Sequence, residues 1–220
     1  MKLSDFDDIR PFAQGEMKEA FESMLSDRQF DKILQGMIPL PKALRNGLLR
    51  CLFFGIKTPL DFQKRYMRHL VYYVLRKTTT GWSYSFPAAL DRKSNYTFMS
   101  NHRDIVLDSA FLCVFLLKAG FSTTVEIAIG DNLLIYPWIK TLVRMNKAFT
   151  VNRGLTPKEM LKSSIHMSQY MHYVINDKHD NIWIAQREGR AKDSDDRTQE
   201  SVLKMLNMGG PTPGKTTAEI

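Results

Sequence analysis

Four short apolar runs alternate with longer segments of helical periodicity between residue 95 and residue 208. The short runs are 96–100, 123–129, 148–152 and 181–186. The longer segments carry apolar residues at three- and four-residue spacing, and they cover 105–118, 133–145, 157–177 and 197–207. A helix between consecutive strands is the connection that parallel strands need. The sequence therefore predicts an α/β fold with a mostly parallel sheet and flanking helices.

The first 80 residues follow a different pattern, because their apolar residues keep helical spacing throughout. Segments 14–25, 42–55 and 60–77 are predicted helices, separated by Pro39, Pro41 and Pro59. We expect three parts: an N-terminal helical region over 1–80, an α/β domain over 81–208 and a flexible tail over 209–220. The tail is rich in Gly, Pro and Thr, which favours a loose chain.

The chain carries 31 basic and 23 acidic residues, and its net charge of +8 implies an acidic partner. Nucleic acid, an anionic lipid surface and a phosphorylated substrate all fit this charge. Aromatic and basic residues interleave only in 64–77, where their spacing is that of an amphipathic helix. We therefore expect no nucleic acid partner.

No run approaches the roughly 18 apolar residues that span a bilayer, and the acidic N-terminus lacks the apolar centre of a signal peptide. These features predict a cytoplasmic protein. The apolar segment 48–56 has Lys42, Arg45 and Lys57 around it, so it either lies on a membrane surface or packs against the domain. The first interpretation predicts a peripheral protein on the inner face of an anionic membrane.

Cys51 and Cys113 both have apolar neighbours, which predicts reduced core residues rather than a disulfide. The five histidines show no spacing typical of metal ligands. We therefore expect no metal site and no cofactor.

Polar clusters follow three of the four predicted strands. Asn101 to Asp104 follow the first, Asn152 and Arg153 the third, and Arg187 to Arg190 the fourth. Since ligands bind at the carboxyl ends of parallel strands, these clusters predict a site at one edge of the sheet.

His102 has two carboxylates nearby in the sequence. A carboxylate at one ring nitrogen fixes the tautomer of a histidine that acts as general base at the other nitrogen. Asp108 lies six positions later and can point back from the following helix toward the ring. Asp104 is closer in sequence, but its position favours capping that helix. A structural histidine remains the alternative.

The Asn-His block with Asp108 and the Glu-Gly-Arg block about eighty residues later resemble the glycerolphosphate acyltransferase family, which includes the lysophosphatidic acid acyltransferases. The family's first block is Asn-His, four residues and Asp, whereas this chain has five residues between His102 and Asp108. The third block is Phe-Pro-Glu-Gly-Thr-Arg, and here Gln186-Arg187 precede Glu188 and the Thr is missing. The middle block, 138–153, ends in a strand and an arginine, and the opening DFDDIRPF is similar to that of a bacterial subgroup.

This resemblance implies a role for each matching residue. His102 would be the base and Asp108 its carboxylate. Substrate would be bound by Arg153, Glu188, Gly189 and Arg190, with Asn101, Arg103, Asp104 and Arg187 as further possible site residues.

The implied reaction moves a fatty acyl group from a thioester, acyl-CoA or acyl carrier protein, to a hydroxyl of glycerol phosphate or a lyso-phospholipid. A phosphate-bearing or amino-acid lyso-lipid acceptor fits this chemistry. The hydroxyl attacks directly, so no Ser or Cys nucleophile is needed, and no G-x-S-x-G motif is present. The alternative is a non-catalytic basic α/β module, either a degenerate acyltransferase scaffold or a binder of anionic lipid or nucleic acid.

Overall fold

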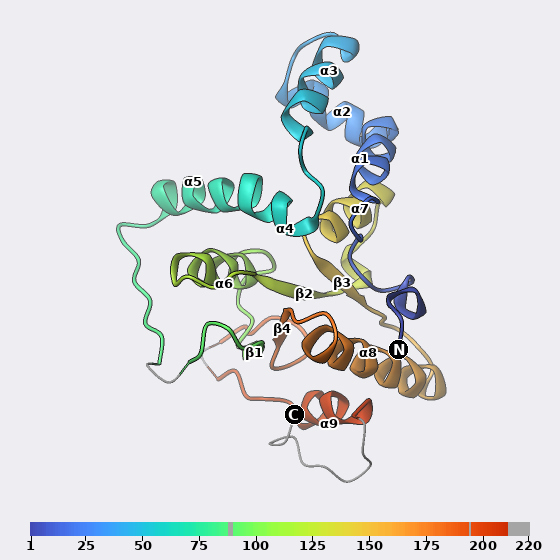
Figure 1. Cartoon of the computed structure of the whole chain (residues 1–220), viewed down its shortest axis with the longest axis vertical. Helices are drawn as coiled ribbons and strands as arrows, with labels where there is room; N and C mark the ends of the chain where they lie inside the picture. The colour runs from blue at the N-terminus through green and yellow to red at the C-terminus, as the bar shows by residue number, and fades with distance from the viewer. Residues whose placement is uncertain (88–89, 194, 211–220) are drawn as a thin grey trace.

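A computed structural model describes residues 1–87, 90–193 and 195–210 of the chain. Its strands are β1 (Thr97–Ser100), β2 (Val125–Gly130), β3 (Ala148–Val151) and β4 (Asn181–Ala185). They form one sheet in the order β1-β4-β2-β3, and every neighbouring pair is parallel (Figure 1). The predicted α/β fold with a parallel sheet is confirmed.

The helices between and after the strands also lie where the periodicity predicts them. They are α6 (Leu107–Lys118), α7 (Pro137–Met145), α8 (Pro157–Asn176) and α9 (Glu200–Met208), with a short 3-10 turn η3 (Asp131–Leu133) before α7. Side chains alternate across β4, so Ile182 and Ile184 pack under α8, whereas Trp183 packs with the residues of α6. The sheet is therefore covered by helices on both faces.

The N-terminal region is helical as predicted, but it contains more elements than the prediction. They are η1 (Leu3–Phe6), α1 (Met17–Ser26), α2 (Arg28–Met37), α3 (Lys42–Phe53), α4 (Pro59–Phe62), a π-helical turn η2 (Gln63–Met67) and α5 (Arg68–Thr78). Helix α2 is not predicted above. The Asp27 side chain caps it by accepting the N–H groups of Gln29 and Phe30.

Helix α7 joins the N-terminal helices to the sheet. In Figure 1, α2 and α3 extend away from the sheet, and α7 lies between α1 and β3. Met17 and Phe21 of α1 share one hydrophobic cluster with Met145 at the end of α7. This contact fixes one end of the helical region against the α/β domain.

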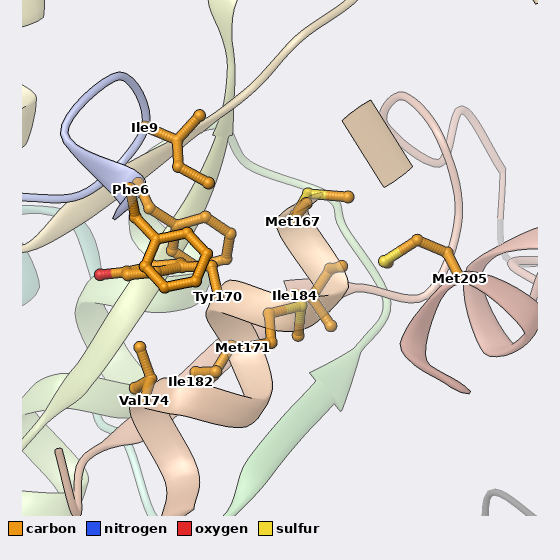
Figure 2. Packing of buried hydrophobic residues seen from close by; sticks show 10 residues of the cluster. Phe6, Ile9, Met167, Tyr170, Met171, Val174, Ile182, Ile184 and Met205 are labelled. Atoms are coloured by element: carbon orange, nitrogen blue, oxygen red, sulfur yellow. The ribbon is translucent and has the colours of Figure 1, made fainter. Parts of the chain in front are cut away.

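The first residues of the chain pack far from α2 and α3. Figure 2 shows Phe6 and Ile9 against Tyr170 of α8, while Met205 of α9 approaches the same helix from another side. The carbonyl of Ile9 accepts the N–H of Thr150 at 2.9 Å. This bond covers part of the exposed edge of β3.

A buried ion pair lies at the opposite end of the strands from the predicted site. Lys147, which adopts a left-handed backbone conformation (φ 64°), precedes β3, and its Nζ lies 2.7 Å from Oδ1 of Asp180. Thr123 Oγ1 accepts a second hydrogen bond from Nζ at 2.8 Å. Both charged side chains are almost completely buried. This pair holds the start of β3 against the start of β4.

The structure corrects one prediction within segment 48–56 and shows which of its residues are buried. Cys51 is exposed, so the prediction that it belongs to the core is wrong, whereas Cys113 is buried. Phe53 and Ile56 pack into the core, but Phe54 is 82% exposed, and Leu48 and Leu52 are also exposed. The segment is therefore buried on one side only.

Gly209 and Gly210 are the part of the predicted tail that the structure describes. Gly209 N–H donates to Ser168 Oγ on α8 at 2.8 Å, so the chain is still packed there. The prediction of a flexible tail otherwise concerns 211–220, which lie outside the described residues. None of the helices in the described part combines the length and apolar character that crossing a bilayer requires.

Candidate active site

The register of the sheet brings the loops with polar clusters together. Ser100 pairs with Ala185, so the loop that carries His102 emerges beside the loop that begins at Gln186. Gly130 pairs with Val151, which places Asp131 beside the loop of Arg153. Oδ1 of Asp131 accepts the N–H of Arg153 at 3.1 Å. The polar clusters predicted to share one edge of the sheet thus do so.

His102 contacts Asp108, with 3.0 Å between Nδ1 and Oδ2. The same oxygen accepts the N–H groups of Arg103 and Asp104 at 2.8 and 3.0 Å. Asp108 lies in the first turn of α6, and both side chains of the pair are largely buried. The carboxylate therefore fixes the backbone of the loop and the orientation of the imidazole together.

Asp104 has a different role in the same loop. Its Oδ1 accepts the N–H groups of Leu107 and Val106, both at 2.8 Å. These hydrogen bonds lower the pKa of Asp104, since they stabilise its ionised form. The N-cap residue of α6 is Val106 rather than the predicted Asp104, which instead binds the N–H groups of the N-cap residue and of the first helical residue.

A pocket of about 380 Å³ opens at this edge of the sheet. The predicted site residues that line it are His102, Arg153, Arg187, Glu188, Gly189 and Arg190. Its apolar wall includes Ile105, Ile127, Ile129, Leu133 and Trp183. The pocket therefore joins one histidine, three guanidinium groups and an apolar wall.

Arg153 is held by its neighbours at the pocket wall. Its Nη1 forms an ion pair with Glu188, while its Nε is buried without a hydrogen-bond partner in the described part of the chain. A Cβ atom on Gly130 would lie 3.1 Å from that Nε and 2.5 Å from Oδ1 of Asn132. Glycine at this position therefore leaves the space that Arg153 and Asn132 occupy.

Three of the further possible residues, Asn101, Arg103 and Asp104, lie outside the pocket lining. Asn101 is exposed. Arg103 is exposed too, and its Nη1 donates to the carbonyl of Asp193 at 3.3 Å. Asp108 and Asp104 stand behind His102 rather than in the lining. Among the described residues, no group of His, Cys, Asp and Glu side chains is arranged to hold a metal ion.

Comparison with known proteins identified no relative of this chain. No protein-family model, curated protein or solved structure matches the chain significantly. The geometry of this edge is therefore the basis for assigning a function.

Neither cysteine is a candidate nucleophile at this edge of the sheet. Burial raises the pKa of the Cys113 thiol to about 11, and Cys51 lies on α3.

Asp196 is a site residue that the sequence does not reveal. Its side chain is only 4% exposed, and Oδ2 accepts the backbone N–H of His102 at 3.0 Å. Oδ1 lies 3.6 Å from Nε of Arg187, which lines the pocket. The N–H of Ala191 donates to the His102 carbonyl at 2.7 Å. The loop after β4 therefore holds both backbone polar groups of His102.

We expect Asp196→Ala to lower turnover at this candidate site by about tenfold to a hundredfold, because a small displacement of His102 disturbs its alignment with a bound substrate. Steady-state kinetics and the pH profile of kcat measure this effect. Asp195→Ala is the control, since Asp195 is exposed and its side chain pairs with the equally exposed Arg197. Equal kinetics for the two variants would show that Asp196 does not position His102.

Proposed function

We propose that the chain is an acyltransferase that moves a fatty acyl group from a thioester to the hydroxyl of a phosphate-bearing lipid precursor, such as glycerol phosphate or a lyso-phospholipid. One observation carries this proposal: the His102–Asp108 pair faces a pocket whose lining also contains Arg153, Arg187 and Arg190. The resemblance to the glycerolphosphate acyltransferases adds support.

In this proposal, Asp108 accepts the Nδ1–H of His102 and leaves Nε2 to accept a proton. Nε2 takes the proton of the acceptor hydroxyl while its oxygen attacks the thioester carbonyl carbon. The carbon–sulfur bond then breaks, and the imidazolium returns the proton to the leaving thiolate. Acyl-CoA and acyl carrier protein are both possible donors, and no cofactor is needed.

The arginines supply the means to hold an anionic acceptor. A guanidinium group can donate two parallel hydrogen bonds to a phosphate. The unsatisfied Nε of Arg153 is a donor that an anionic ligand could engage after a small side-chain movement. Glu188 pairs with Arg153, so we assign it the role of orienting this arginine.

Replacing Arg153 or Arg190 with lysine should raise the KM for a phosphorylated acceptor by about tenfold, with a smaller effect on the KM for the acyl donor. Lysine keeps the charge but loses the paired hydrogen bonds. Arg197→Lys is the control, because Arg197 is exposed and outside the pocket lining. If both pocket variants keep the normal acceptor KM, the acceptor carries no phosphate at this position, and an amino-acid lyso-lipid becomes the better candidate.

An acyl-transfer assay with acyl-CoA and acyl carrier protein donors tests the proposed function itself. The acceptors should include glycerol phosphate, lyso-phospholipids and amino-acid lyso-lipids. Turnover with a hydroxyl acceptor supports the proposal. Absence of turnover with every pair, together with lipid binding, would favour the non-catalytic module instead.

We also propose that the protein works in the cytoplasm, on the inner face of an anionic membrane. Helices α2 and α3 expose an apolar surface, here called the α2–α3 face, made of Ile33, Met37, Leu40, Leu44, Leu48 and Leu52. The exposed Lys42 and Arg50 lie on α3 beside it. Apolar residues flanked by cations are typical of helices that lie on a membrane.

Binding to anionic vesicles should fall as the salt concentration rises, because salt screens a contribution of roughly 1 kcal/mol for each Lys or Arg near the surface. Sedimentation with vesicles measures it. Replacing Leu44 and Leu48 with serine should weaken binding further, whereas Leu70→Ser, which changes an exposed leucine of α5, should not. Equal binding to neutral vesicles would contradict the electrostatic part of this proposal.

A further inference from the structure

Exposed apolar side chains gather in the loops and the helix start that follow the strands around the candidate pocket. They occur in adjacent pairs after three strands of the sheet. The pairs are Ile105 and Val106 after β1, Ile135 and Tyr136 after β2, and Met160 and Leu161 after β3, and each residue is at least 42% exposed. We call these six residues the rim patch.

The topology places the three pairs at one edge of the molecule, because all strands are parallel and their carboxyl ends share one side. Ile105 belongs both to the rim patch and to the lining of the pocket. The apolar surface therefore continues from the pocket to the exterior.

Several basic side chains lie near the rim patch in the sequence and form no ion pair within the described part of the chain. Lys158 and Lys162 flank Met160 and Leu161 on the first turns of α8, and Lys140 follows Tyr136 on α7. Arg190 and Lys192 are exposed on the loop after β4. Two exposed acidic residues nearby are engaged: Glu188 pairs with Arg153, and Glu159 accepts the N–H of Thr156 at the start of α8.

We propose that the rim patch docks on the surface of an anionic lipid bilayer, with the pocket opening into the headgroup layer. This inference rests on the proposed function and deepens it, since a lipid substrate would then pass from the bilayer to His102 without entering water. Short apolar pairs at loop tips insert shallowly, and the lysines beside them contact lipid phosphates.

A bilayer fits these features better than a protein partner does. The rim patch comes from two loops and the start of α8, and its pairs alternate with exposed lysines rather than surrounding one central pocket for an anchor residue. Tyr136 offers an apolar ring with a polar end, which suits the boundary between acyl chains and water.

An environment-sensitive fluorophore on single cysteines tests this docking. The protein background is Cys51→Ser, because Cys51 is exposed and would react, whereas Cys113 is buried. Labels are placed at Ile135→Cys, in the loop after β2, and at Leu161→Cys, near the start of α8. Asp177→Cys is the matched control, since it is exposed just after the other end of α8.

The probe membrane is a vesicle of equal parts phosphatidylcholine and phosphatidylglycerol. We expect a blue shift at both rim positions, quenching by nitroxide-labelled acyl chains, and no change at position 177. Replacing Ile135, Tyr136 and Leu161 with serine should lower the vesicle partition coefficient by about tenfold. Leu70→Ser with Tyr73→Ser, on exposed positions of α5, should leave it unchanged. Thermal unfolding of each variant verifies that it is folded.

Two outcomes would overturn the proposal: bound protein whose rim labels do not change, or no binding to these vesicles at all. Both are distinct from failure of the proposed function. An inserted rim without acyl transfer would preserve the docking surface and remove the reaction. Turnover of water-soluble substrates without insertion would preserve the reaction and remove the docking surface.

Discussion

Replacing His102 with alanine should lower the rate of acyl transfer by about 10²–10⁴-fold, the usual cost of losing a general base. The imidazole is the proton acceptor in the proposed reaction, and it lines the pocket, whereas its partner Asp108 does not. Steady-state kinetics under saturating donor and acceptor measure the loss. The circular dichroism spectrum and the thermal midpoint should stay close to those of the unmodified protein.

His69→Ala provides the matched control, because His69 is an exposed residue of α5 and should tolerate the change without kinetic effect. Full activity of the His102 variant would remove the proposed mechanism. A loss of activity that accompanies unfolding would leave the role of the imidazole undecided, so His102→Gln, which keeps a polar side chain of similar size, is measured in parallel. We expect it to be folded and as inactive as His102→Ala.

Asp180→Ala should reduce the free energy of unfolding by about 3–5 kcal/mol, because it leaves the charge of Lys147 buried without a counter-ion. The ammonium lies 2.7 Å from Asp180 Oδ1, and the lysine side chain is only 4% exposed. Urea unfolding at neutral pH measures the change. The effect falls on stability, since the pair lies at the end of the sheet opposite the pocket.

Replacing both partners distinguishes the free-energy cost of an unpaired buried charge from the cost of lost packing. Asp180→Ala combined with Lys147→Met should be more stable than Asp180→Ala alone, because no uncompensated charge is left in the interior. Glu200→Ala is the surface control, since its i,i+4 pair with Lys204 is exposed and solvent-screened, so its loss should change the stability little. A similar small loss for Asp180→Ala would show that water reaches Lys147.

Periodicity predicted the strands and the crossover helices because buried strands and amphipathic helices have to repeat their apolar positions. Helix α2 was not predicted from the periodicity. Its sequence nevertheless has helical features, namely Asp27 as cap and apolar residues at 30, 33, 34 and 37. The predicted helix over 60–77 is in fact α4 and α5 joined by the π-helical turn at Gln63–Met67. Such a change of hydrogen-bond pattern leaves the spacing of apolar residues almost unaltered.

The sequence predicted those residues of the candidate site that directly follow the strands. The positions of His102, Arg153 and Glu188 follow from parallel topology alone. Asp196 could not be found in this way, because it stands in a charged loop beside Asp195 and only tertiary packing buries it. The exposure of Cys51 was missed for a related reason: apolar neighbours in sequence do not show which side of a helix meets the core.

The contacts of the first residues have a consequence for the order of folding. The ring of Phe6 packs against Tyr170, and the carbonyl of Ile9 accepts a hydrogen bond from Thr150. Neither contact can form until most of the chain has left the ribosome. Contacts between such distant residues are costly to form early, because a long loop must close first. The beginning of the polypeptide should therefore be among the last parts to settle, and until then the edge of β3 stays open to pairing with other chains.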